Sequence, residues 1–179
     1  MELLQIILIG LSLSMDAFSL ALVYGTTNLD KKMIRFLSIL VGVFHFIMPF
    51  IGSILGLIII QTLIPNPDKL VGIIFIVLSI EMLLSAKNLD TKVQVIKSIS
   101  QSFLFAFSVS LDSFSVGIGL GSAGVNIILC GVIFSIISAT FTLLGLKLGK
   151  HLALKYGRIA NVVGSILLLF LGLEYFFQI

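Results

Sequence analysis

Two aspartates occur within apolar stretches that are long enough to cross a membrane. Asp16 lies in SLSMDAFSLALVYG, and Asp112 lies in FSVSLDSFSVGIGLG. A carboxylate at the centre of a bilayer costs at least about 2.5 kcal/mol on insertion scales, so a chain keeps one only where a partner or a function offsets that cost. No lysine or arginine falls in the deep part of any apolar stretch. Two such acids facing each other would repel unless a proton or a metal ion joined them.

Hydroxyl groups flank both aspartates at helical spacing. Positions i−4 and i+3 share a helix face with position i. The four positions concerned are all serines: Ser12, Ser19, Ser108 and Ser115. Carboxylate, hydroxyl and carbonyl oxygens suit Mg²⁺, Ca²⁺ or Mn²⁺ better than soft ions. The pattern therefore predicts a divalent-cation site at Asp16 and Asp112, with the serines as auxiliary ligands. The alternative is that both acids are protonated and only hydrogen-bond neighbouring helices.

Three further side chains have metal-binding or proton-transfer chemistry. His45 lies mid-span in FHFIMPF, where its imidazole could bind a metal, accept a proton or hydrogen-bond another helix. The thioether of Met15 would favour a transition metal, but on a regular helix it points about 100° away from Asp16, which favours core packing. Glu81 lies near a span end, where we expect it to snorkel or to pair with Lys87.

Small residues and a proline mark places where a span either packs closely or opens. Gly117, Gly119 and Gly121 end the Asp112 stretch. They indicate close helix packing or a locally opened helix that exposes carbonyl ligands. Pro49 either kinks its span, which would free a carbonyl near residues 43–45, or is only a bend.

The composition is that of an integral membrane protein. Of the 179 residues, 59% are hydrophobic and 11% are charged, whereas soluble domains carry about 25% charged residues. A membrane helix needs about 20 apolar residues. This length predicts an all-α fold with six spans and no separate soluble domain. The first span has no basic n-region or cleavage site, so we expect it to be retained. The spans are 3–24, 34–61, 70–86, 99–120, 125–146 and 159–177.

The distribution of basic residues predicts the orientation. Ten of the eleven lysines and arginines follow the first, third and fifth spans, and Lys69 is the exception. The positive-inside rule makes that side cytoplasmic and places both termini outside. The basic residues form no patch or arm of the kind that binds nucleic acid. Cys130 is the single cysteine, which excludes an internal disulfide and a CxxC relay.

The two halves of the chain resemble each other. Residues of the first predicted span recur 96 positions later, and residues of the second and third recur 93 positions later. The pairs are Ser12/Ser108, Ser14/Ser110, Asp16/Asp112, Phe18/Phe114, Ser19/Ser115, Gly25/Gly121, Gly52/Gly145, Gly56/Gly149 and Glu81/Glu174. Each half, about 1–90 and 91–179, has three spans, so the second copy enters the membrane from the opposite side. The sequence predicts one transmembrane domain, residues 1–179, built as an inverted-topology 3+3 repeat with its site near the midplane.

Several motifs carry a family resemblance. SMDAFSLAL, FHFIMPFIGSILG and SLDSFSVGIGLG resemble the MntP family of bacterial manganese efflux pumps, over essentially the whole chain. The resemblance implies Mn²⁺ export across the bacterial cytoplasmic membrane, with the family's functional aspartates at Asp16 and Asp112. Ser113, Phe114 and His45 depart from the residues that the family often has there. These departures resemble a related sporulation-associated branch and leave the identity of the metal open.

We therefore expect a secondary transporter and not an enzyme. The chain has no Walker-type GxxxxGK[ST] sequence, no HExxH sequence and no cysteine pair, so we expect neither ATP hydrolysis nor a bound cofactor. The predicted activity is efflux of Mn²⁺ through the two-aspartate site, driven by an ion gradient. One alternative is an exporter of cobalt, cadmium or a cationic amino acid, and another is a membrane scaffold or assembly factor. The sequence leaves the oligomeric state open, a homo-oligomer included.

Overall fold

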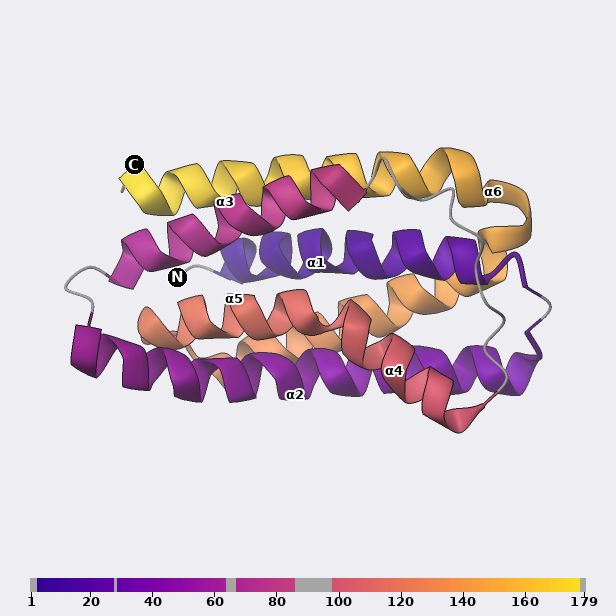
Figure 1. Ribbon diagram of the computed structural model, residues 1–179, viewed down its shortest axis with the longest axis horizontal. Coiled ribbons are helices and arrows are strands. Elements are labelled where there is room, and N and C mark those ends of the chain that lie inside the picture. The colour runs from indigo at the N-terminus through magenta and orange to yellow at the C-terminus, as the bar shows by residue number, and fades with distance from the viewer. Residues whose placement is uncertain (1–2, 28, 64–66, 86–97, 178–179) are drawn as a thin grey trace.

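The computed structural model describes residues 3–27, 29–63, 67–85 and 98–177, and within these ranges the secondary structure is entirely helical. Figure 1 shows long helices that run roughly along one axis, with α1 in the middle of the bundle. The helices are α1 (Leu3–Tyr24), α2 (Lys31–Leu63), α3 (Pro67–Ser85), α4 (Ile99–Val109), α5 (Leu111–Ser122) and α6 (Ile127–Phe177).

The candidate membrane spans come from four long segments and one bent pair. By length and composition the four are Leu3–Tyr24, Lys31–Ile58, Ile127–Gly149 and Ile159–Phe177, and α4 with α5 makes a fifth if the pair is one span. Helix α6 contains two of them, which run in opposite directions in Figure 1. The prediction of a multi-pass, all-helical membrane protein is confirmed. The predicted span 70–86 lies largely within α3, which is not among these candidates.

The predicted fourth span, 99–120, is not one continuous helix. It bends by 41° between α4 and α5, and Ser110 stands at the break with φ −101° and ψ 1°. The Ser110 N–H donates to Phe107 O at 3.1 Å, while its hydroxyl donates to Ala106 O at 2.6 Å. Such side-chain bonds to the preceding turn compete with the helix ladder and bend helices. The chain is therefore interrupted just before Asp112, whereas the glycine-rich end of α5 stays helical.

Glycines let two pairs of helices pack backbone against backbone. In the α2–α5 seam, a Cβ on Gly117 or Gly121 would overlap the backbone of Pro49 or Ser53. In the α1–α6 seam, a Cβ on Gly149 would overlap the backbone of α1. Close approach through small residues is how helices associate in lipid, where apolar burial gives no driving force between them. The alternative of close packing therefore holds for Gly117 and Gly121, and Pro49 lies inside the unbroken α2 as part of the seam.

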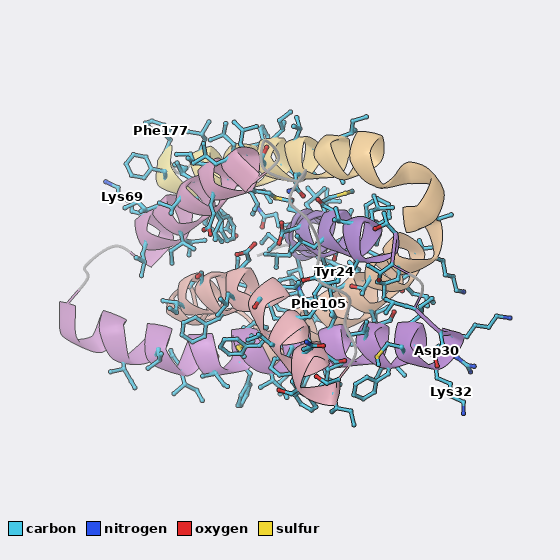
Figure 2. All side chains as sticks on the ribbon, turned by 45° about the vertical axis from the view of Figure 1, so that its right-hand side comes forward. Tyr24, Asp30, Lys32, Lys69, Phe105 and Phe177 are labelled. Atoms are coloured by element: carbon cyan, nitrogen blue, oxygen red, sulfur yellow. The ribbon has the colours of Figure 1, made fainter. Side chains whose placement is uncertain are left out.

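The two ends of the bundle differ in charge. Both termini lie at the same end in Figure 1, and Gln5 Nε2 there donates to Glu174 Oε1 at 2.9 Å. Figure 2 places Lys69 and Phe177 at that end and Lys32 at the opposite one. At the Lys32 end, Asp30 caps the N-terminus of α2. Its Oδ1 accepts a hydrogen bond from the Met33 N–H at 2.6 Å. This arrangement has the charge asymmetry on which the predicted orientation depends.

Two alanine substitutions in α5 test the α2–α5 seam. Gly117→Ala should destabilise the protein by about 1–3 kcal/mol, the usual cost of overpacking a tight contact, because its new methyl group would meet Pro49 backbone. Gly119→Ala is the matched control, since a Cβ there would lie 3.4 Å from Val71 Cα, an ordinary contact. Thermal unfolding of the purified protein measures both. Equal melting temperatures for the two variants would contradict the seam.

Candidate cation site

The two aspartates occupy different local structures. Asp16 lies in the middle of α1, whereas Asp112 lies in the first turn of α5, directly after the break at Ser110. Both residues are partly buried. The N-terminal end of a helix carries partial positive charge and unpaired N–H groups, which stabilise a carboxylate in the first turn. The break therefore gives Asp112 a compensating field that Asp16, in mid-helix, does not have.

A third carboxylate joins the pair. Asp112 interacts electrostatically with Asp16 and with Glu81, and Asp16 interacts with Glu81 as well. Glu81 is exposed near the end of α3, and its expected partner Lys87 lies outside the described residues. Its charge nevertheless acts on both aspartates. Helices α1, α3 and α5 thus each contribute one acid to the same region.

Asn161 of α6 is the polar residue that sequence reasoning missed. Its side chain is fully buried and lies close to the Asp16 carboxylate. Neither its amide oxygen nor its amide nitrogen has a partner of good hydrogen-bond geometry among the described residues. A buried amide without partners costs free energy, so its position next to an acid indicates a place where a ligand or water completes the bonding. The sequence signal that could have identified it was a single asparagine within a predicted span that is otherwise apolar.

Methionine side chains line one flank of this region. A Cβ on Gly164 of α6 would lie 2.9 Å from Met15 Cβ and 3.0 Å from Met82 Sδ. Met82 is buried, and Met15 packs against the same apolar cluster. Helices α1, α3 and α6 therefore converge tightly through these thioethers, and the contacts give Met15 a packing role.

His45 presents a free ring nitrogen inside the protein. Its Nδ1 lies 3.0 Å from Val41 O and 3.1 Å from Ser110 Oγ. A carbonyl can only accept, so Nδ1 carries the proton in the neutral ring and Nε2 holds the lone pair. Nε2 is buried without a partner among the described residues. This geometry leaves Nε2 ready to accept a proton or to bind a cation.

The contact between His45 and Ser110 has a counterpart in the other half of the chain. Ser14 Oγ of α1 lies 3.0 Å from Ser138 Oγ of α6. Ser14 and Ser110 differ by 96 positions, and His45 and Ser138 differ by 93. The two serines on the aspartate helices also donate to their i−4 carbonyls at 2.6 Å each. The same polar link therefore occurs twice, at the offsets found in the sequence.

The seam contacts follow the same pairing. A Cβ on Gly52 would meet Phe114 O, and a Cβ on Gly145 would meet Phe18 O. A Cβ on Gly56 would meet Ile118 O, and a Cβ on Gly149 would meet Leu22 O. Each of these glycines packs on the aspartate helix of the other half.

The four serines predicted as auxiliary ligands have different surroundings. Ser12 is buried and donates to Leu8 O at 2.9 Å, whereas the buried Ser19 hydroxyl has no partner among the described residues. Ser115 is partly buried and donates to Leu111 O at 3.4 Å. Ser108 is exposed on α4 and donates to Leu104 O at 2.8 Å, on the far side of the break from Asp112. None of the four forms a hydrogen bond with a carboxylate in the described part of the chain.

The described residues contain no group of three or more His, Cys, Asp or Glu side chains placed to hold a metal ion. In this conformation the acids act on one another electrostatically, but their oxygen atoms do not converge on one position where a metal ion could bind. The donors near them are oxygen atoms of carboxylate and amide groups, a set that suits hard divalent cations. Binding by several of them at once therefore requires a shift of one helix toward another or bridging water.

Comparison with known proteins identifies the family. Residues 28–176 match a family model described as "Putative manganese efflux pump". The chain belongs to the MntP family. A relative from Bacillus mycoides (strain KBAB4) is 34% identical over 178 residues, which cover 99% of this chain and 98% of that protein. One from Bacillus cereus (strain ATCC 10987 / NRS 248) is 35% identical over 183 residues, with the same coverage.

Both relatives carry the name "Putative manganese efflux pump MntP", which describes transporters and not enzymes. No solved structure matches the chain. The match to these MntP relatives extends over nearly the full length of both chains, so it includes every helix that carries the acids.

A double-mutant cycle tests the polar link between α1 and α6. Ser14→Ala and Ser138→Ala should each destabilise the protein, and their coupling energy should be about 0.6 kcal/mol, the average for such bonds in membrane proteins. The cycle is measured by equilibrium unfolding in mixed micelles. Ser108→Ala is the control, because its exposed hydroxyl bonds only its own helix. Strict additivity of Ser14→Ala and Ser138→Ala would contradict the link.

Proposed function

We propose that this chain exports Mn²⁺ by alternating access, with Asp16 and Asp112 as the principal ligands of the transported ion. The observation that carries the proposal is the electrostatic interaction between Asp16 on α1 and Asp112 on α5, with the charge of Glu81 acting on both, in a chain of the MntP family. Acids held together in a membrane protein repel one another, and a divalent cation relieves that repulsion. The names of the relatives supply the identity of the ion.

Glu81 and Asn161 complete the donor set in this proposal. Mn²⁺ accepts carboxylate, carbonyl and water oxygens together with imidazole nitrogen, so the unpartnered Asn161 amide is a suitable neutral ligand. The lone pair on His45 Nε2 is a suitable proton acceptor near the break. A small movement of α3 toward α1 would bring Glu81 onto an ion already held by the aspartates. Binding and release of the ion then depend on the distance between α3 and α1.

We also propose that protons move inward as Mn²⁺ moves out. An inside-negative potential opposes cation export by about 2.3 kcal/mol per charge per 100 mV, so passive export of a doubly charged ion is unfavourable. Protonation of the emptied acids would cancel their repulsion and return the site through the membrane. The same groups therefore bind either one divalent ion or protons, which makes the exchange obligatory.

The architecture in this proposal is an inverted repeat of six spans, with α3 as the third. Two features support it. The polar link between helices occurs once in each half. The glycines of α2 pack on α5 of the second half, and those of α6 pack on α1 of the first half. The basic end of the bundle faces the cytoplasm of a bacterium and both termini face outward, as the positive-inside rule favours. The two seams would then open alternately on opposite sides of the membrane.

Neutralising either aspartate should abolish transport. Asp16→Asn and Asp112→Asn proteins should insert and fold yet lose more than about 90% of Mn²⁺ efflux, because one lost charge-assisted ligand costs at least about 1.5 kcal/mol. Efflux is followed in proteoliposomes with and without an imposed pH gradient, with Co²⁺ and Cd²⁺ as competing ions. Asp30→Asn is the control, since asparagine also begins helices well and Asp30 lies at the exposed start of α2. Unchanged efflux in both aspartate variants would favour a scaffold.

A substitution of Glu81 tests the third carboxylate. Glu81→Gln should weaken Mn²⁺ binding by about tenfold, because it removes one charge from the field at the aspartates. Adding Asn161→Asp should recover part of that affinity, because it restores a carboxylate beside Asp16. Glu174→Gln is the control, since Glu174 bonds Gln5 at the terminal end. Calorimetric titration with Mn²⁺ measures all four proteins. Equal affinities for the Glu81→Gln and Glu174→Gln proteins would remove Glu81 from the site.

A further inference from the structure

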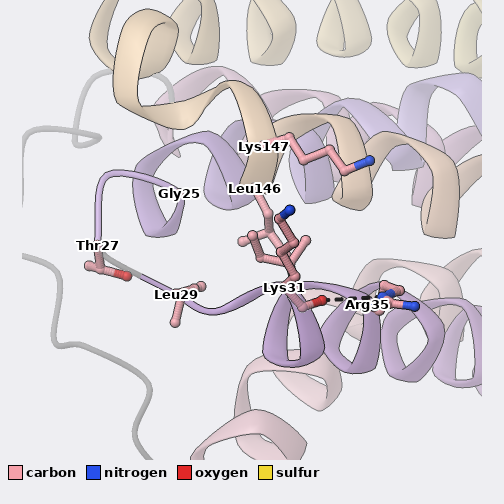
Figure 3. Close-up of a pocket in the computed structure, with 8 residues that line it drawn as sticks. Gly25, Thr27, Leu29, Lys31, Arg35, Leu146 and Lys147 are labelled. Atoms are coloured by element: carbon pink, nitrogen blue, oxygen red, sulfur yellow. Dashed lines mark hydrogen bonds between the residues drawn. The ribbon is translucent and has the colours of Figure 1, made fainter.

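A pocket of about 570 Å³ opens at the basic end of the bundle, away from the acids. Figure 3 shows that it lies between the α1–α2 connection, the start of α2 and the middle of α6. Its charged lining consists of Lys31 and Arg35 from α2 and Lys147 from α6. Among the described residues no carboxylate lines it, so three cationic side chains surround one space.

These cations are not neutralised by the described part of the protein. Within that part, none of the three forms an ion pair with a carboxylate. Asp30, the acid next to Lys31, directs its Oδ1 to the Met33 N–H at 2.6 Å. Arg35 Nε donates to Lys31 O at 3.4 Å, the bond drawn in Figure 3, and the terminal guanidinium nitrogens have no hydrogen-bond partner among the described residues. Like charges around a common space repel, and an anion bound between them relieves that repulsion.

The remaining wall of the pocket consists of Gly25, Thr27 and three apolar side chains. Leu29, Ile34 and Leu146 line it beside the charges. A ligand that satisfies both surfaces carries an anionic group and a short apolar portion. Arginine binds phosphate oxygens in a bidentate way, and lysine binds them as a point charge. At the cytoplasmic surface of a membrane, basic pockets between helices bind the headgroups of acidic lipids.

The charge is confined to one of the two repeat-related ends. Gly25 of the pocket belongs to the α1–α6 seam, whose counterpart is the α2–α5 seam. At the offset of 93 that relates α2 to α6, the position equivalent to Lys31 is Gly124, the one equivalent to Arg35 is Ile128, and the one equivalent to Lys147 is Ile54. The packing of the seam therefore occurs in both halves, but its basic pocket occurs in one.

We propose that this pocket binds a phosphate-bearing anion, supplied by the headgroup of an acidic phospholipid or by free phosphate. The anion joins Lys31 and Arg35 of the first half to Lys147 of the second. Bound there, it holds α2 and α6 together beside the α1–α6 seam.

The test is binding of defined probes to the full-length protein in neutral detergent. The probes are dioleoyl phosphatidylglycerol, dioleoyl phosphatidylcholine and inorganic phosphate, and bound molecules are counted by native mass spectrometry. Phosphatidylglycerol should bind at least about tenfold more tightly than phosphatidylcholine. Lys147→Gln and Arg35→Gln should each weaken it about fivefold, the effect expected for one interfacial charge. Lys32→Gln is the matched control, because this exposed neighbour of Lys31 does not line the pocket.

The outcomes separate the sources of the anion. Phosphatidylglycerol binding that millimolar phosphate does not displace identifies a lipid site. Binding of phosphate with no preference for the acidic lipid identifies a free-anion site. Failure of both probes to bind overturns the proposal, and so does an equal effect of Lys32→Gln and Lys147→Gln, which would indicate general attraction to a basic surface. Arg35→Lys keeps the charge but not the bidentate geometry, so it should lose less affinity than Arg35→Gln does.

Discussion

The main physical constraint on this structure is the free-energy cost of holding acidic side chains inside a membrane protein. Asp16, Asp112 and Glu81 come from three helices and interact with one another, and no lysine or arginine in the described part of the chain forms an ion pair with them. Like charges held near one another inside a membrane protein repel, and an unpaired charge there is costly. The arrangement is stable when the acids are protonated or when a cation joins them. An exchange of a divalent ion for protons uses both of these states, so the electrostatic constraint and the proposed transport cycle have one origin.

Backbone packing complements that constraint. Glycines on α2 and α6 let each of these helices approach the aspartate-bearing helix of the opposite half. The polar link between Ser14 and Ser138, and its counterpart between His45 and Ser110, lie between the same pairs of elements. The aspartate helices are thus held by extensive close packing with few side-chain hydrogen bonds between helices. Contacts of this kind suit a protein in which one end opens while the other stays closed.

The sequence predicted the long elements well and their local breaks poorly. Residues 3–24 and 159–177 coincide with helical spans because continuous apolar runs leave the backbone no other way to satisfy its hydrogen bonds in lipid. The break at Ser110 escaped prediction, since nothing in SVSLDS distinguishes it from SLSMDA, which stays helical in α1. Glu81 and Asn161 were missed for another reason. Their proximity to Asp16 depends on how α6 packs against both α1 and α3, which a linear pattern does not encode.

Locating bound Mn²⁺ by diffraction tests the proposed two-aspartate site most directly. Crystals of the full-length protein soaked in Mn²⁺ give anomalous scattering at the manganese edge, which locates the ion without reference to any assumed mechanism. The account predicts a single strong peak between the carboxylates of Asp16 and Asp112, with Glu81 or Asn161 drawn toward it. The same experiment on the Asp16→Asn protein should show no peak there. A peak that lies elsewhere in the wild-type protein, or that persists undiminished in the variant, would contradict the account.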